Sequence, residues 1–169
     1  VTIKGMRLDG HLLISGPEAI AGASLDGSGG SSTTTTAAAA VSGNQNTLVL
    51  MANFQDKALS CSTTQVNDVM FGPSNSVAGL YNETSYNLVT FSGSTYGPWQ
   101  IPYNSTDTCA YSTWSAALDN MATAQGINLS DYPRRVYVFP GSTCGAGYGS
   151  LGSTPSRSWI FYCGYRDVY

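Results

Sequence analysis

Four widely spaced cysteines constrain this chain more than any other sequence feature. Their number is even and no C-x-x-C pair occurs, which favours two disulfide bonds over a metal cluster. The cysteines are Cys61, Cys109, Cys144 and Cys163. Four cysteines allow three pairings. We expect Cys144 to pair with Cys163, closing a glycine-rich loop, and Cys61 to pair with Cys109.

Charge and composition disfavour one class of partner, the nucleic acids. The 169-residue chain has the length of one main domain. Only 10% of its residues are charged, the formal net charge is -3, and the seven cationic residues are scattered except for the Arg134-Arg135 pair. A surface that follows a phosphate backbone needs clustered positive charge. We therefore expect no nucleic-acid partner.

Three N-x-S/T sequons predict N-linked glycans as partners of the chain. The acceptor residues are Asn82, Asn104 and Asn128. Each lies beside polar or turn-forming residues, where a glycan has access to solvent. Together with the cysteines, the sequons indicate a secreted protein of the extracellular matrix or cell surface. No run reaches the roughly 20 apolar residues of a membrane span, and the start at Val1 indicates a processed N-terminus.

The chain divides into three parts. Residues 1–26 contain two alternating runs around Asp9-Gly10, which predict a β-hairpin. Residues 27–45 are a low-complexity linker of Gly, Ser, Thr and Ala, with too few large apolar groups to offset the entropy of ordering. Residues 46–169 carry the pattern of an α/β domain.

The pattern of the third part predicts a mixed sheet with two or three helices. Strands are expected over 46–54, 86–91, 96–101, 134–140 and 157–162, with a turn at 92–94 joining the second and third. A first helix is expected through Phe71, with Thr63 or Thr64 as its cap. A second helix is expected to begin at Ser74 or Asn75, and a third is expected over 112–126 with a cap at Ser112. The spacing of Val77, Leu80 and Tyr81 predicts that the second helix buries that face.

The residues of this sequence give little indication of a catalytic site. His11 is the single histidine, so neither a Ser-His-Asp triad nor the H-E-x-x-H zinc motif is present. Residues 147–152 fit G-x-G-x-x-G, but the residues that follow do not predict the helix that a dinucleotide-binding loop requires. The carboxylates are dispersed, so we expect solvated loop acids and helix caps. The eleven tyrosines and three tryptophans are expected mainly in the core, with a glycan-binding face as the alternative.

Several segments taken together resemble one family, the gametolysin-like zinc metallopeptidases of the metzincin-like group. The resemblance covers about residues 46–160 and rests on N-T-L-V-L-M-A-N-F-Q-D at 46–56, on S-V-A-G-L-Y-N-E-T-S-Y at 76–86 and on V-Y-V-F-P at 136–140. It implies an opening strand, a helix and an inner strand in that order. The 76–86 segment is the most specific of the three, and the resemblance places Glu83 on a supporting helix away from the metal.

The resemblance implies an upper subdomain of a metzincin-like peptidase without its zinc site. In that family the H-E-x-x-H helix follows the strand and loop that resemble residues 157–160, and this sequence ends at Tyr169 without it. The hairpin is then the tail of a propeptide. No catalytic or metal residue transfers to a numbered position here, and zinc is expected only with a missing C-terminal half.

Two functions follow as hypotheses. The chain is the N-terminal portion of a secreted zinc endopeptidase acting on extracellular-matrix or cell-wall glycoproteins, and is not competent by itself. Alternatively it is a non-catalytic structural or binding component of an extracellular assembly built on a peptidase-derived fold, because a fold does not determine a function. The partner is the missing C-terminal half in the first case and another extracellular protein in the second. In the first case, Trp159, Phe161 and Tyr162 are expected to be covered by the missing half.

Overall fold

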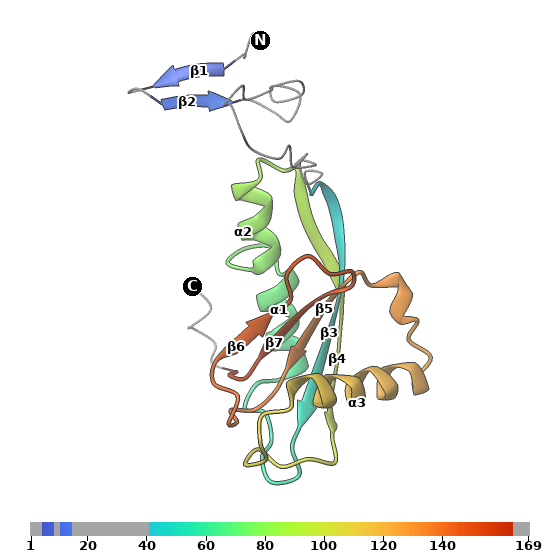
Figure 1. Cartoon of the computed structure of the whole chain (residues 1–169). Helices are drawn as coiled ribbons and strands as arrows, with labels where there is room; N and C mark the ends of the chain where they lie inside the picture. Colours follow the sequence, from blue (N-terminus) through green and yellow to red (C-terminus); the bar gives the residue numbers. More distant parts are fainter. Residues whose placement is uncertain (1–4, 9–10, 15–40, 164–169) are drawn as a thin grey trace, which may run out of the picture. The chain divides into compact units, whose positions relative to one another are not determined.

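A five-stranded mixed sheet with three α-helices forms the larger described part of the chain, which confirms the predicted α/β class (Figure 1). The computed structural model describes residues 5–8, 11–14 and 41–163. The elements of the larger part are, in order, β3 (Gly43–Asn53), α1 (Thr63–Phe71), α2 (Val77–Thr84), β4 (Val89–Gln100), α3 (Tyr111–Ala124), the 3₁₀ helix η2 (Leu129–Asp131), β5 (Arg134–Val138), β6 (Gly147–Gly149) and β7 (Ser156–Ile160).

The predicted N-terminal hairpin is confirmed. β1 (Gly5–Leu8) and β2 (His11–Ile14) pair antiparallel, with Leu8 opposite His11. The hairpin belongs to a separate compact unit, Val1–Val41. The low-complexity residues 27–40 lie outside the described residues. β3 begins at Gly43, three positions before the predicted strand, because Gly43 to Gln45 pair with β4 although they are polar.

The strand order in the sheet is β4-β3-β5-β7-β6. The first four strands are parallel, and β6 runs antiparallel to β7 at one edge. Strands of a parallel sheet are covered on both faces and are therefore apolar throughout. The run from Leu48 to Ala52 has this character and is fully buried.

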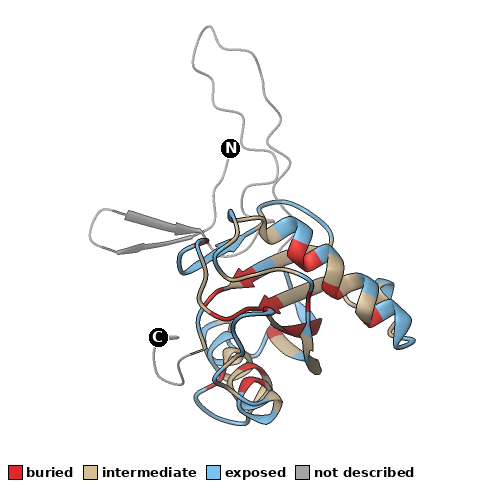
Figure 2. Cartoon of the chain, turned by 90° about the horizontal axis from the view of Figure 1, so that it is seen from below, coloured by how far each residue is buried: buried red, intermediate tan, exposed pale blue. Residues whose placement is uncertain are grey.

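Alternate residues of β3 face two separate hydrophobic cores. Leu48 and Leu50 pack in one core with Trp114 of α3, and Val49 and Met51 pack in the other with Met70 of α1. Side chains of a strand alternate between its faces, so α1 and α3 cover opposite faces of the sheet. Figure 2 shows the buried residues along the central strands and on the inner sides of the helices.

The predicted turn at 92–94 is wrong. Residues 89–100 form one long strand, β4, parallel to β3. The polar Ser92, Gly93 and Ser94 have turn-like composition, but β4 is an edge strand and two of them are exposed on it. Packing also requires a glycine at position 93, because a Cβ atom there would collide with the carbonyl oxygen of Thr47.

Gly93→Ala should lower the free energy of unfolding by about 1–3 kcal/mol, because backbone atoms of β3 and β4 must separate to admit the methyl group. Chemical denaturation measures the change. Gly149→Ala is the matched control in β6, since a Cβ atom there meets no neighbouring atom. Equal stabilities for the two variants would contradict the close approach of β4 to Thr47.

The three helices lie near their predicted positions, but their ends and one buried face differ. α1 is capped by Ser62, whose side chain accepts from the Gln65 amide, so the cap expected at Thr63 or Thr64 is wrong. α2 is capped by Ser76 and begins at Val77, later than the predicted start at Ser74 or Asn75. α3 begins at Tyr111 without a side-chain cap, so the cap expected at Ser112 is wrong. The predicted buried face of α2 is also wrong, because Leu80 and Tyr81 are 59% and 48% exposed.

Candidate functional site

The cysteines form two disulfides, as predicted, but the expected pairing is wrong. Cys61 is bonded to Cys163, and Cys109 is bonded to Cys144. The physical reason is the division of the core by the sheet. Cys109 and Cys144 belong to the core on the α3 face, whereas Cys61 and Cys163 belong to the core on the α1 face. Proximity in sequence misled the prediction, since Cys144 and Cys163 lie on opposite faces.

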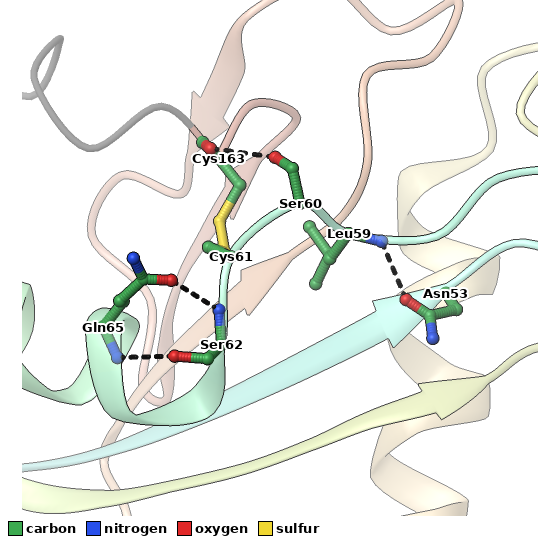
Figure 3. Close-up of a disulfide and its surroundings, with 7 residues drawn as sticks. All are labelled: Asn53, Leu59, Ser60, Cys61, Ser62, Gln65 and Cys163. Carbon is green, nitrogen blue, oxygen red and sulfur yellow. Dashed lines mark hydrogen bonds between the residues drawn. A yellow bond between two sulfur atoms is a disulfide. The ribbon is translucent and has the colours of Figure 1, made fainter.

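The Cys61–Cys163 disulfide joins the start of α1 to the residue three positions beyond β7 (Figure 3). Local hydrogen bonds hold its surroundings in place. Ser62 and Gln65 form a reciprocal capping box, with distances of 2.9 and 3.2 Å. The hydroxyl of Ser60 donates to the carbonyl oxygen of Cys163 at 3.2 Å. The chain is thus anchored where it leaves β7.

An apolar groove of about 190 Å³ lies beside this disulfide. It is lined on the helix side by residues of α1 and on the sheet side by residues of β5 and β7. The principal apolar residues are Val66, Val69, Met70, Val136, Val138 and Ile160. α1 therefore covers β3 on this face, while part of β5 and β7 is left accessible. We call this feature the apolar groove.

The opposite face of the same strands is covered. Trp159 and Phe161, which we expected to be uncovered, are 8% and 2% exposed and pack in the α3 core. That expectation is wrong for these two residues, whereas Tyr162 is 59% exposed and lines the apolar groove. The accessible surface therefore lies on the α1 face of the sheet.

A partly buried polar cluster connects α3 to β5. Arg135 donates to Asp119 Oδ2 at 3.0 Å and to the Leu129 carbonyl at 3.0 Å, and the Tyr137 hydroxyl donates to Asp119 Oδ1 at 2.9 Å. Burial, reinforced by the negative charge of Asp119, raises the pKa of Tyr137 to about 12. A neutral tyrosine whose hydroxyl donates a hydrogen bond to a carboxylate is an anchor for the fold. Sequence reasoning missed this cluster because it treated Asp119 as one of the solvated acids.

The raised pKa of Tyr137 predicts a loss of stability at alkaline pH. The unfolded chain, with a tyrosine pKa of 10.0, loses this proton before the folded chain does, so the contribution is complete below pH 10 and disappears as the pH rises to about 12. The two-unit shift corresponds to about 2.7 kcal/mol. Denaturant titrations should show this loss in the unmodified chain relative to Tyr137→Phe, and parallel pH profiles for the two would contradict it.

The three sequons occupy different settings on the surface. Asn82 lies within α2, Asn104 lies in the loop after β4, and Asn128 caps η2. Asn128 is exposed, and its side chain is ordered by Ser130 and Asp131, with the Asn128 amide donating to Asp131 Oδ1 at 3.0 Å. The Ser105 amide and hydroxyl in the second sequon donate to Asp56, which lowers the pKa of that carboxyl. Glycosylation of these sites remains a prediction.

The other motifs do not combine into a reactive centre. His11 is the first residue of β2, and Glu83 lies on α2 with an exposed side chain. The G-x-G-x-x-G segment forms β6 and the loop before β7, and no helix follows it among the residues described up to Cys163. Across the described part of the chain, no group of three or more His, Cys, Asp or Glu residues is placed to hold a metal ion.

No protein-family model and no curated protein matches this chain. Among the helices in the described ranges, none has the length and apolar character needed to cross a bilayer. The candidate binding surfaces of the fold are therefore above all the apolar groove and the exposed edge strand β6.

Proposed function

We propose that this chain is the N-terminal, non-catalytic portion of a secreted gametolysin-like zinc endopeptidase that acts on extracellular-matrix or cell-wall glycoproteins. The sequence of this chain contains no H-E-x-x-H motif. In this proposal a C-terminal half beyond Tyr169 supplies the H-E-x-x-H helix, and that helix packs into the apolar groove. The two disulfides support an oxidising, extracellular compartment.

The apolar groove is the observation that carries this proposal. A parallel sheet requires cover on both faces, and α1 leaves β5 and β7 partly accessible on its side. Cys163 lies at the edge of the groove, and its disulfide to Cys61 holds the residues after β7 beside α1. An amphipathic helix that begins there would bury Val136 and Ile160 against its own apolar side chains.

The exposed strand β6 supports the part of the proposal that concerns a peptide substrate. All three of its residues are exposed, and it pairs only with β7 among the described strands. An unpaired edge presents backbone N–H and C=O groups that bind an extended peptide by adding a strand. A zinc site on a helix after β7 would then lie near a substrate held along this edge.

The three segments that resemble the gametolysin-like family also form the kinds of helix and strand that the resemblance implies. Residues 46–56 contain most of β3, residues 76–86 contain α2, and β5 is an interior strand of the sheet. These correspond to the opening strand, the helix and the inner strand that the resemblance implies. This agreement supports the proposal without testing the chemistry.

The proposal is tested on the polypeptide from its native source. Peptide mapping should find sequence beyond Tyr169 that contains an H-E-x-x-H helix, and the protein should degrade a matrix glycoprotein in a reaction that a chelator stops and zinc restores. In that polypeptide, Val136→Lys should reduce cleavage by placing a charge in the apolar groove, whereas Leu151→Lys, at a 96% exposed position, should not. A native chain that ends at Tyr169, without zinc-dependent cleavage, would exclude the peptidase.

A second candidate function is supported by an apolar surface on and after α2. Leu80, Tyr81, Tyr86 and Leu88 are all exposed. Exposed apolar patches mark protein partners. If the peptidase is excluded, this surface favours a structural or binding component of an extracellular assembly. Cross-linking in the native matrix would then identify a protein bound across α2, and Leu80→Ser with Leu88→Ser should abolish that cross-link.

A further inference from the structure

A second groove lies on the opposite face of the sheet from the apolar groove. It has a volume of about 550 Å³ and lies between the end of β4, the end of α3 and η2. The side chains that determine its chemistry are Tyr96, Trp99, Gln125, Asn128, Asp131 and Tyr132. We call it the aromatic groove. Its volume falls in the range of small-molecule sites, about 300–1,000 Å³.

One wall of the aromatic groove is an aromatic platform. The rings of Tyr96 and Trp99 are nearly parallel, at 22°, with centroids 6.5 Å apart. Both side chains are half-buried and pack against the α3 core, which fixes their orientation. Of the three tryptophans, Trp99 alone is not buried. The accessible Trp99 ring, with the Tyr96 ring stacked beside it, presents a flat apolar face of the kind that stacks on another flat apolar face.

The rim of the aromatic groove supplies amide and hydroxyl groups and one carboxylate for hydrogen bonding. Within the described residues, the side chains of Gln125 and Tyr132 make no hydrogen bond, and the lining contains no lysine, arginine or histidine. Asp131 contributes the single carboxylate. An aromatic wall with amide, hydroxyl and carboxylate groups suits a ligand that has apolar C–H faces and many hydroxyls, and the absence of a cation disfavours an anionic ligand.

We propose that the aromatic groove binds a short neutral saccharide, with one sugar ring stacked on Trp99 and its hydroxyls bonded to Gln125 and Asp131. The inference does not depend on the peptidase, because neither the groove nor its ligand involves the apolar groove or a metal. Asn128 lies on the rim and is the acceptor of a sequon. The saccharide therefore has two sources, a glycan attached to Asn128 or a chain from outside.

A glycan attached to Asn128 would favour occupancy of the aromatic groove without adding contacts. A tethered ligand experiences an effective concentration in the millimolar range. The Asn128 side chain is held by Ser130 and Asp131, so the first sugar would start from a defined position beside the platform. A stacked glycan would shield Trp99 and Tyr96 from solvent.

The test uses the full chain, produced with and without N-glycosylation, and N,N′-diacetylchitobiose, the disaccharide that begins every N-glycan, as the probe. Titration of the unglycosylated chain should shift tryptophan fluorescence to shorter wavelength, because Trp99 is the accessible tryptophan. Isothermal titration calorimetry, which does not need Trp99 as a reporter, should show weaker binding for Gln125→Ala and for Trp99→Phe, with Trp99→Ala weakening it roughly five- to tenfold. Tyr148→Ala, at an exposed aromatic residue outside the groove, should leave it unchanged.

The glycosylated chain distinguishes the two sources. If the glycan on Asn128 occupies the groove, the glycosylated chain should already show the shifted fluorescence and should bind the probe only after Asn128→Gln. If an external saccharide is the ligand, the glycosylated chain should bind the probe as the unglycosylated one does. Absence of probe binding to both Asn128→Gln and the unglycosylated chain, with native circular dichroism, would overturn the proposal.

Discussion

Cys61→Ser with Cys163→Ser should lower the free energy of unfolding by about 4.7 kcal/mol, because this disulfide closes a loop of about 100 residues in the unfolded chain. The two cysteines are 102 positions apart, so the cross-link joins the first helix to the end of the last strand. A loss of this size is comparable with the total stability of many domains. Denaturant unfolding of the variant and the unmodified chain measures the difference.

The second disulfide provides the matched control. Cys109 and Cys144 are 35 positions apart, and the same relation predicts a loss of about 3.8 kcal/mol for the Cys109→Ser, Cys144→Ser variant. Each double variant should retain the other cross-link, which peptide mapping without reduction can verify. A peptide linking Cys144 to Cys163 in the unmodified chain, or an unchanged unfolding midpoint in either variant, would contradict this account.

Asp119→Ala should cost about 3 kcal/mol, the lower end of the range for a buried pair, because it leaves the Arg135 guanidinium charged, largely buried and without its carboxylate. The side chains of Arg135 and Asp119 are 11% and 17% exposed, and their closest atoms are 3.0 Å apart. The variant also removes the acceptor of the Tyr137 hydroxyl. Thermal and denaturant unfolding should both show the loss.

Two further variants separate charge from packing at this cluster. Asp119→Leu combined with Arg135→Met removes both charges, and most of the lost stability should return, since a buried ion pair contributes little over apolar residues of similar volume. Asp68→Ala is the control for an exposed acid on α1, with an expected change within about 0.5 kcal/mol. If Asp119→Ala behaved like Asp68→Ala, the cluster would not anchor α3.

The elements of this fold follow from local patterns in the sequence. The apolar run at 48–52 predicts a strand buried on both faces, and β3 has this character. The stripe of Trp114, Leu118 and Ala122 predicts α3, and Gly126, with φ +81°, follows its end as expected. Such features depend on residues a few positions apart, so periodicity and turn chemistry reveal them.

Features that depend on the position of an element in the sheet were not predictable from these patterns. Ser92, Gly93 and Ser94 have the composition of a turn, yet they continue β4 because an edge strand tolerates polar residues and Gly93 admits the close approach of Thr47. The short strand β6 within the glycine-rich segment forms only because β7 is available to pair with it.

The linear sequence by itself predicted two disulfides and alternating strands and helices, because cysteine number and hydrophobic periodicity can be read without the tertiary structure. The tertiary structure alone decided which cysteines pair, since the sheet separates Cys61 and Cys163 from Cys109 and Cys144 onto opposite faces. It also decided which surfaces remain open. The apolar groove and the aromatic groove are each built from segments far apart in sequence, and their convergence depends on the order of strands in the sheet.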